Sequence, residues 1–408
     1  MRRASTVVVG AGVAGVWTAE QLRRAGYDGS VVLVGGEAHL PYDRPPLSKE
    51  YLTEPGAAAP LLAPEEHYKA QDIELELGVP VADLDLDRQR LTFADGRLLS
   101  YDDLVLATGS RARSLACVPP ADNVFYLRSL DDATGLRSIL QDRPRVVIAG
   151  GGFIGLEVAA ASRCMGAEVT VVEGADAPLE LVVGRHLGEC VARLHEAHGV
   201  EVVTGETVER VIGDRLVTRV VTSAGRVLDC DALVVGVGAV PADELALAAG
   251  VPVEGGVLVD SCCRAGAPHV WAVGDVARLC HPVLGEAVRV EHWDTARRHA
   301  AVAAASITGR QEPCTRLPWF WSDQYDVNFQ YVGYALRWDE LLVRGAPDDM
   351  DFTALYLQGG RVRAALSAGR PRDVRAVERI IASGRLVERS VLADPSTDLR
   401  RLGRSGDD

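Results

Sequence analysis

The chain has 408 residues, 48% of them hydrophobic, and a formal net charge of −14 at pH 7. This length is sufficient for two or three domains, each with its own core. The negative charge disfavours a nucleic acid or an anionic membrane as partner, and no apolar run approaches the roughly 20 residues that span a bilayer. Because the start of the chain leads directly into a glycine-rich motif and not into a signal peptide, we expect a cytoplasmic protein.

The eight cysteines show neither CxxC pairs nor the paired spacing of metal ligands. We therefore expect no zinc site, no iron–sulfur cluster, no other bound metal and no disulfide framework. Cys262 and Cys263 are adjacent. A vicinal redox pair stays open there, although two ordinary thiols in a reducing cytosol are the favoured interpretation.

Residues 5–37 have the pattern of a strand, a glycine turn, a helix and a second strand. Gly10, Gly12 and Gly15 have GxGxxG spacing. The first glycine permits a tight turn, the second lets the backbone approach a pyrophosphate, and the third lets helix and strand pack closely. Glu37 follows about 20 residues after the turn, where an acidic side chain accepts hydrogen bonds from a ribose. This context favours a dinucleotide site over a glycine turn of purely structural use.

The stretch PYDRPPLSK, residues 41–49, comes shortly after this unit. Proline fixes φ and removes a backbone donor, so Pro45 and Pro46 form a stiff wall that loses little conformational freedom on folding. Such a wall suits a flat ring, with Lys49 placed beside it. The alternative is a rigid surface loop with an exposed lysine.

The strand–turn–helix–strand pattern returns in residues 144–176. Here Gly150, Gly152 and Gly155 form the turn, and Glu173 ends the second strand. Two copies of a weak motif, each in the correct context, are a strong signal of an enzyme that holds two dinucleotides, as when hydride passes from a nicotinamide to a flavin. Phe153 and Ile154, inside the second turn, are expected to pack against the helix.

Glu173 also bears on which nicotinamide is bound. A carboxylate accepts hydrogen bonds from the two ribose hydroxyls but repels a 2′-phosphate, whose binding favours arginine. The stretch that follows, GADAPLELVV, contains acidic residues and no arginine. We therefore expect NADH to be preferred over NADPH.

Three further segments consist of an apolar strand followed by a glycine turn: YDDLVLATGSR at 101–111, DALVVGVGAVPADELA at 231–246 and VWAVGDVA at 270–277. They could be sheet members only. In the last of them, however, Gly274 permits close approach and Asp275 could hold a ribityl or ribose hydroxyl. Because this strand lies beyond the second glycine unit, we expect the first domain to be completed by chain that returns after the second domain is inserted.

The motifs PYDRPPLSK, ATG, GGGFIGLE, VGVGAVP, AVGD and WFWSDQYD occur in this order. Together they resemble the flavin-dependent ferredoxin reductases that serve bacterial cytochromes P450 and Rieske oxygenases, the putidaredoxin reductase type. The resemblance covers essentially the whole chain. It implies a glutathione-reductase-like α/β fold with two Rossmann-like domains: an FAD domain split between residues 1–112 and 241–316, an inserted NADH domain at 113–240, and a C-terminal α/β interface domain at 317–408.

The resemblance also implies roles for individual residues. Lys49 would face the flavin and pair with Glu157, and these two are the expected catalytic residues. The FAD-binding positions would be Gly10, Gly12, Gly15, Glu37, Arg44, Pro45, Lys49, Val81, Ala107, Thr108, Gly109, Arg128, Gly274, Asp275, Trp293 and Trp321. The NADH-binding positions would be Gly150, Gly152, Phe153, Ile154, Gly155, Glu157, Glu173 and Gly238. The ribose-binding acid of the family falls at Gly36, so Glu37 or a water would replace it.

The expected function is that of an NADH-dependent FAD flavoprotein that reduces a [2Fe-2S] ferredoxin, which in turn serves a cytochrome P450 or a Rieske oxygenase. One alternative is an NADH oxidase or peroxidase, or a thiol-disulfide reductase of the same fold. A second is a non-catalytic, NADH-sensing flavoprotein. Neither the helix after the first glycine turn nor residues 41–49 contain a cysteine, which disfavours electron transfer to a protein disulfide.

Two features bear on where a ferredoxin would dock. Trp319, Phe320 and Trp321 either belong to the core of the interface domain or line the exposed edge of the flavin, and the resemblance favours Trp321 as the edge residue. An acidic ferredoxin would need a local basic patch on this acidic chain. The candidates, each of which could instead be an ordinary solvated charge, are Arg297, Arg298, Arg337, Arg344, Arg370, Arg372, Arg375 and Arg379.

Overall fold

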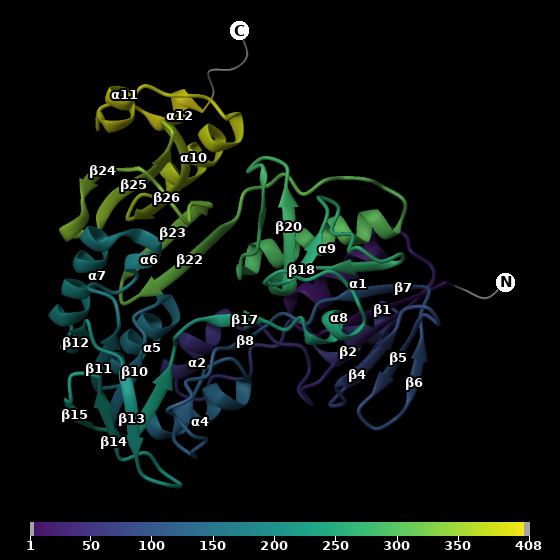
Figure 1. The fold of residues 1–408 in the computed structure, drawn as a ribbon, viewed down its shortest axis with the longest axis horizontal. Coiled ribbons are helices and arrows are strands. Elements are labelled where there is room, and N and C mark those ends of the chain that lie inside the picture. The colour runs from purple at the N-terminus through teal and green to yellow at the C-terminus, as the bar shows by residue number, and fades with distance from the viewer. Residues whose placement is uncertain (1–3, 404–408) are drawn as a thin grey trace. The chain divides into compact units, whose positions relative to one another are not determined.

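A computed structural model describes residues 4–403 of the chain. The chain forms two compact units, each assembled from separate segments (Figure 1). The first comprises Met1–Asp43, Pro60–Arg111 and Val240–Pro318. The second comprises Arg44–Ala59, Ala112–Ala239 and Trp319–Asp408, so most of the proline-rich stretch lies in the second unit. The four-segment domain division expected from the sequence stays a prediction.

The first unit is built on a five-stranded parallel sheet in the order β19-β7-β1-β2-β3. Its strands are β1 (Ser5–Val9), β2 (Ser30–Gly35), β3 (Ile73–Leu77), β7 (Asp103–Leu106) and β19 (Val270–Ala272). The central strands are continuous runs of buried apolar residues, as expected for strands covered on both faces. Because β19 comes from beyond the second glycine unit and pairs with β7, the prediction that returning chain completes the first domain is confirmed.

Helices cover this sheet, and smaller sheets flank it. The helices are α1 (Val13–Arg24), α3 (Glu65–Ala70), α8 (Glu244–Ala248), α9 (Trp293–Ile307) and the 3-10 turn η2 (Gly274–Val276). Strands β4 (Val81–Asp85), β5 (Arg90–Phe93) and β6 (Leu98–Ser100) form one small sheet, and β18 (Val257–Val259), β20 (Ala277–His281) and β21 (Glu286–Val288) form another. One hydrophobic core joins the sheet to α1 and α9.

The second unit contains another five-stranded parallel sheet, in the order β12-β11-β10-β16-β9. Its strands are β9 (Val124–Phe125), β10 (Arg145–Ala149), β11 (Glu168–Glu173), β12 (Val200–Thr204) and β16 (Ala232–Val235). The accompanying helices are η1 (Pro45–Ser48), α2 (Glu50–Thr53), α4 (Leu130–Leu140), α5 (Phe153–Cys164), α6 (Glu180–Val183) and α7 (Arg185–Ala197). The hairpin sheet of β13 (Val208–Ile212), β14 (Arg219–Thr222) and β15 (Val227–Asp229) adjoins them. Strands β8 (Ser110–Ala112) and β17 (Ala239–Pro241) each contain a point where the chain passes from one unit to the other.

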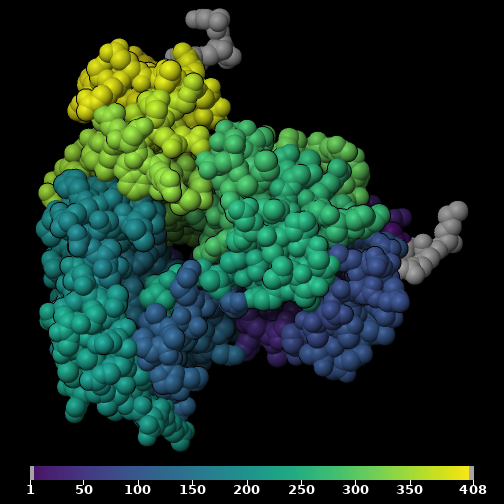
Figure 2. Space-filling view, in the orientation of Figure 1, coloured from purple at the N-terminus to yellow at the C-terminus, as the bar shows by residue number. Residues whose placement is uncertain are grey.

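The C-terminal part of the second unit is an antiparallel sheet in the order β22-β23-β26-β25-β24, followed by helices. The strands are β22 (Trp319–Gln324), β23 (Val327–Gly333), β24 (Glu340–Ala346), β25 (Asp351–Gln358) and β26 (Arg361–Ala368), and the helices are η3 (Pro347–Asp349), α10 (Pro371–Ser383), α11 (Arg389–Ala393) and α12 (Leu399–Leu402). The yellow-green sheet domain packs directly on the teal domain that contains α7 (Figure 2). A shared core joins Leu187 and Val191 to Phe329 and Tyr356. The predicted α/β fold class is confirmed.

All eight cysteines carry free thiols. Cys262 and Cys263 are buried, and burial raises the pKa of Cys263 well above its usual range. A thiol that resists ionisation is a poor nucleophile. Within residues 4–403, no helix has both the length and the apolar character needed to cross a bilayer. In the same part of the chain, no cluster of three or more histidine, cysteine or acidic residues could hold a metal ion.

Candidate active site

The first glycine turn joins β1 to α1 and depends on the absence of side chains. Gly10 has φ of +119°, and a Cβ placed on it would lie 2.1 Å from the carbonyl oxygen of Ala107. A Cβ on Gly15 would lie 1.8 Å from the carbonyl oxygen of Gly10. Gly12 caps α1 without a side-chain hydrogen bond, so the first amides of the helix keep their donors for a ligand. This arrangement suits a pyrophosphate.

The second turn, between β10 and α5, is built in the same way. Gly150 has φ of +104°, and a Cβ on it would lie 2.5 Å from the carbonyl oxygen of Gly236. A Cβ on Gly155 would lie 2.2 Å from the carbonyl oxygen of Gly150. Gly152 caps α5, again without a side-chain hydrogen bond. Each unit therefore contains one turn that fits a dinucleotide.

The two predicted ribose-binding acids have different surroundings. Glu173, at the end of β11, accepts hydrogen bonds from the backbone amides of Gly151 at 2.6 Å and Ala175 at 2.8 Å. These bonds hold its carboxylate beside the second turn. Glu37 lies just beyond the end of β2 and accepts a hydrogen bond from Tyr42 Oη at 2.6 Å. Both acids lie where a ribose is expected in a Rossmann-type unit, and their roles stay predictions.

Residues Pro45–Ser48 of the proline-rich stretch form the short helix η1, and Lys49 follows as its C-cap. The Lys49 ammonium lies 2.9 Å from Glu157 Oε2 and 3.3 Å from the carbonyl oxygen of Pro45. The predicted pairing of Lys49 with Glu157 is thereby confirmed. Glu157 lies on α5, one turn beyond the glycine loop, and its side chain is only 3% exposed. A buried carboxylate of this kind requires a charged partner and further hydrogen bonds.

Two serines complete the surroundings of Glu157. Ser48 Oγ donates a hydrogen bond to Glu157 Oε2 at 2.5 Å, and Ser322 Oγ donates one to Glu157 Oε1 at 2.7 Å. The sequence analysis did not identify either serine. Serine is common in loops and strands, and only the tertiary structure brings residues 48, 157 and 322 together. Arg44, the N-cap of η1, donates a hydrogen bond from Nε to the carbonyl oxygen of Arg128 at 3.1 Å. The structure thus brings these two predicted site residues into contact.

In the first unit, the structure also positions the predicted residues near Asp275. Asp275 accepts a hydrogen bond from Ser110 Oγ at 2.8 Å, and a Cβ on the preceding Gly274 would lie 2.8 Å from the side chain of Ala14 in α1. The Gly274–Asp275 turn therefore lies next to the first glycine turn. Thr108 Oγ1 donates to the carbonyl oxygen of Ala242 at 2.7 Å. Ala107 and Gly109 flank Thr108 at the end of β7.

The start of α9 carries buried polar atoms. Trp293 Nε1 donates to Asp43 Oδ1 at 2.7 Å. Thr295 Oγ1 and His299 Nδ1 are buried and have no hydrogen-bond partner among residues 4–403. Burial lowers the pKa of His299 to about 4, so its ring is neutral near pH 7. Unpaired buried polar atoms are costly, and a cofactor with several polar groups would satisfy them. The residues present in this unit therefore fit a flavin dinucleotide.

The structure also places the predicted site residues Val81, Gly238 and Ile154. Val81 begins β4, directly after Pro80, which lies 3.6 Å from a Cβ placed on Gly36. Gly238 lies between β16 and β17 with φ of +99°. Ile154 is 48% exposed, so the expectation that it packs against the helix is wrong. It projects from the first turn of α5 to solvent, whereas Phe153 packs inward.

Successive side chains of a strand point to opposite faces, so the three aromatic residues of β22 lie on two different faces. The Phe320 ring contacts the rings of Phe153, at 4.9 Å between centroids, and Tyr331, at 5.3 Å. Trp319 and Trp321 point to the opposite face, where their rings stack at 5.4 Å and both stay partly exposed. Phe320 therefore contributes to the core, and Trp319 and Trp321 lie together on the other face of the strand. The role of Trp321 stays a prediction.

The arginines proposed for a basic docking patch differ in exposure and in whether they pair with an acidic residue. Arg344 is only 4% exposed, and its guanidinium donates to backbone carbonyl oxygens of residues 392–397, so the expectation that it belongs to a docking patch is wrong. Arg298 pairs with Asp294, and Arg370 pairs with Asp351. The candidates that remain exposed are Arg337, Arg372, Arg375 and Arg379.

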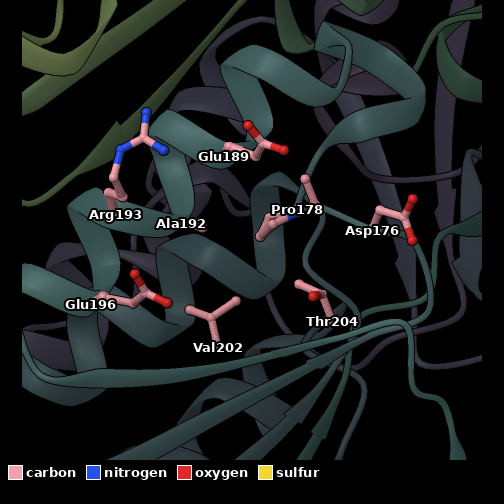
Figure 3. A pocket seen from close by; sticks show the side chains of 9 residues that line it. Asp176, Pro178, Glu189, Ala192, Arg193, Glu196, Val202 and Thr204 are labelled. Atoms are coloured by element: carbon pink, nitrogen blue, oxygen red, sulfur yellow. The ribbon is translucent and has the colours of Figure 1, made fainter.

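A surface pocket lies between α7 and the ends of β11 and β12 (Figure 3). Glu189, Arg193 and Glu196 reach it from α7, and Asp176 and Thr204 lie on the opposite side. No predicted site residue lines it. Its three carboxylates against one arginine make it unsuitable for a phosphate group.

A glycine turn for a dinucleotide in each unit and a buried lysine–glutamate pair define a flavin- and nicotinamide-dependent oxidoreductase. Residues 4–300 match the family model of the pyridine nucleotide-disulphide oxidoreductases, and residues 319–403 match the model named reductase C-terminal. The chain belongs to the pyridine nucleotide-disulphide oxidoreductase family. The resemblance inferred from its motifs is confirmed by the relatives that follow.

The chain is 40% identical to the ferredoxin–NAD(+) reductase component of the anthranilate 1,2-dioxygenase system of Burkholderia cepacia, over 97% of this chain and 98% of the relative. It is 38% identical to putidaredoxin reductase of Pseudomonas putida, over 98% of this chain and 96% of that protein. Its structure is similar to that of putidaredoxin reductase in the covalent complex with putidaredoxin, with a TM-score of 0.94 at 37% identity and 98% coverage of both chains.

Proposed function

We propose that this protein is a ferredoxin–NAD(+) reductase: an FAD flavoprotein that passes electrons from NADH to a [2Fe-2S] ferredoxin serving a cytochrome P450 or a Rieske oxygenase. The full-length similarity to reductases of oxygenase systems supports this proposal. The observation within the chain that carries it is the buried Lys49–Glu157 pair at the end of the proline-rich helix. Bound FAD supplies the chemistry, because it accepts a hydride and gives up electrons singly.

The residues of the chain bind and orient the two dinucleotides. In this proposal the first glycine turn and α1 hold the pyrophosphate of FAD, with Asp275 on a hydroxyl of the same cofactor. The second turn and α5 hold NADH, and Glu173 accepts hydrogen bonds from its ribose. Lys49 supplies positive charge beside the flavin, where negative charge develops on reduction.

The same proposal includes the domain division and the cellular location. The FAD domain comprises residues 1–112 and 241–316, the NADH domain 113–240, and the interface domain 317–408. The Trp319–Trp321 pair is the proposed contact with the ferredoxin. A cytoplasmic location is supported by the eight free thiols, which are typical of a reducing compartment.

Reduction of a ferredoxin tests the function directly. The purified holoenzyme, mixed with NADH and a [2Fe-2S] ferredoxin, is expected to reduce the ferredoxin much faster than it reduces oxygen or a disulfide. Replacing the three cysteines that are not buried, Cys117, Cys164 and Cys280, by serine should leave this rate unchanged. Electron transfer that proceeds only to oxygen or a disulfide, or a long-lived NADH complex without turnover, would favour the oxidase, disulfide-reductase or sensor alternatives. Acid precipitation should release the FAD, since no covalent attachment is expected.

The choice of nicotinamide tests Glu173. We expect kcat/KM for NADH to exceed that for NADPH by tenfold or more, about 1.4 kcal/mol, because the carboxylate repels a 2′-phosphate. Glu173→Gln removes the charge but keeps an acceptor for the amides of Gly151 and Ala175. The ratio of kcat/KM for NADH to kcat/KM for NADPH should therefore decrease. Steady-state kinetics with both nicotinamides measure this. Equal efficiencies in the wild type would remove Glu173 from the proposed role.

A further inference from the structure

The carboxylate of Glu157 receives three donors from two parts of the second unit. Lys49 Nζ lies at 2.9 Å and Ser48 Oγ at 2.5 Å from Oε2, and both belong to the segment that carries the proline-rich stretch. The third donor, Ser322 Oγ, lies 2.7 Å from Oε1 and comes from β22 of the C-terminal sheet. Ser322 is thus the donor to the second oxygen, which the lysine and Ser48 do not contact.

Behind Ser322 the hydrogen bonds continue through buried residues. Gln324 Nε2 lies 3.2 Å from Ser322 Oγ, and Gln324 Oε1 lies 3.0 Å from His195 Nε2 on α7. His195 Nδ1 lies 3.2 Å from Tyr325 Oη. Ser322, Gln324 and His195 are at most 1% exposed. A fully connected buried polar network of this kind is rigid, because each member loses its partners if one moves.

The direction of every bond in this network follows from the carboxylate. An ionised carboxylate only accepts, so Ser322 donates its hydrogen to Glu157 and must accept from Gln324 Nε2. Gln324 Oε1 then accepts from His195 Nε2–H, which leaves His195 Nδ1 to accept from the Tyr325 hydroxyl. All four hydrogens therefore point toward Glu157. Hydrogen bonds aligned in this way polarise one another and strengthen the last donor.

The network fixes position and does not carry protons. The amide of Gln324 neither gains nor loses a proton at ordinary pH. Burial also lowers the pKa of His195 to about 4, so the ring stays neutral near pH 7. What the network can do is hold the Ser322 hydroxyl at one point on one oxygen of Glu157. The other oxygen is then turned toward Lys49.

We propose that Ser322, supported by Gln324 and His195, is a positioning residue that orients the Glu157 carboxylate toward Lys49 for reduction of the flavin by NADH. The inference rests on the proposed function. It assigns to β22 a second role: Ser322 and Phe320 lie on the inner face of the strand, and Trp319 and Trp321 lie on the other. The same strand therefore carries the tryptophan pair and orients the charge pair.

The test uses the holoenzyme with Ser322→Ala, Ser322→Thr and a matched control, Ser367→Ala. Ser367 is also buried, at 1% exposure, in the same sheet, but its hydroxyl bonds to the carbonyl oxygens of Phe352 and Arg370. Stopped-flow absorbance gives the rate constant of flavin reduction at saturating NADH and the Kd for NADH. Spectroelectrochemistry gives the midpoint potential of the flavin. Thermal unfolding reports stability for each variant.

For Ser322→Ala we expect flavin reduction to slow about tenfold while the Kd for NADH changes less than twofold. The midpoint potential should become more negative, because the carboxylate loses a donor that balances its charge. Ser322→Thr keeps the hydroxyl and should have the wild-type rate of flavin reduction and the wild-type midpoint potential. Ser367→Ala should lower only the unfolding temperature. Ser322→Cys keeps the volume with a weak donor, and it provides the same comparison if the alanine variant does not fold.

A double-mutant cycle with Glu157→Gln decides whether Ser322 acts through Glu157. Ser322→Ala should slow the Glu157→Gln variant no further. Equal slowing in both backgrounds, or a Ser322→Ala variant with the rate and potential of Ser367→Ala, would overturn the inference. A wild-type protein whose flavin is not reduced by NADH would instead contradict the proposed function, so the two failures are distinguishable.

Discussion

Replacing Lys49 by methionine is expected to slow reduction of the flavin by NADH about a hundredfold while FAD stays bound. Methionine keeps an apolar stem beside the proline-rich helix, but the positive charge that favours reduced flavin is lost. Removing one preorganised electrostatic group from a water-excluded site typically costs on the order of 10²–10³ in rate. Stopped-flow reduction by NADH and titration of the apoprotein with FAD measure the two effects separately.

Part of this defect could come from the carboxylate that is left behind. Glu157 would keep its hydroxyl donors, Ser48 and Ser322, but would have no cation, and a buried charge without a partner is strongly unfavourable. The double variant Lys49→Met with Glu157→Gln removes both charges and separates the two contributions. An unchanged hydride-transfer rate in the single variant would make residues 41–49 only a stiff loop.

Arg344→Met is expected to destabilise the C-terminal domain by about 3 kcal/mol. Arg344 Nη1 donates to the carbonyl oxygens of Leu392 at 2.6 Å and Asp394 at 2.7 Å, and Nη2 donates to that of Thr397 at 2.6 Å. Methionine fills a similar volume but leaves these carbonyl oxygens without donors. Faster hydrogen exchange in residues 389–403 and a lower unfolding temperature should accompany the change.

The matched control is Arg375→Met on α10, where the arginine is exposed and has no acidic partner among the residues described. This variant should keep wild-type stability, because it removes no buried hydrogen bond. Its effect on ferredoxin binding, measured over a range of salt concentrations, reports whether the exposed face of α10 contributes to docking. An Arg344→Met variant with unchanged stability and weakened ferredoxin binding would return Arg344 to the docking patch.

The parts of the fold that the sequence predicted are those with local causes. The two glycine turns could be located because positive φ and close backbone approach exclude side chains at Gly10 and Gly150. Each turn therefore has a recognisable glycine pattern within a few consecutive residues. The buried strands could be located because parallel strands covered on both faces are continuous apolar runs. The pairing of Lys49 with Glu157 came from the resemblance of whole motifs and was confirmed by their 2.9 Å contact.

The sequence by itself determined two glycine turns of dinucleotide-binding type, the apolar strands that frame them and the family. Only the tertiary structure decided that Ser48 and Ser322 meet on Glu157, that strand alternation separates Phe320 from the two tryptophans, and that Arg344 is buried under residues 392–397. The physical reason is the distance along the sequence between the residues that interact. Turn conformation and strand burial leave a local pattern, whereas a hydrogen bond between residues 165 positions apart depends on how distant segments pack.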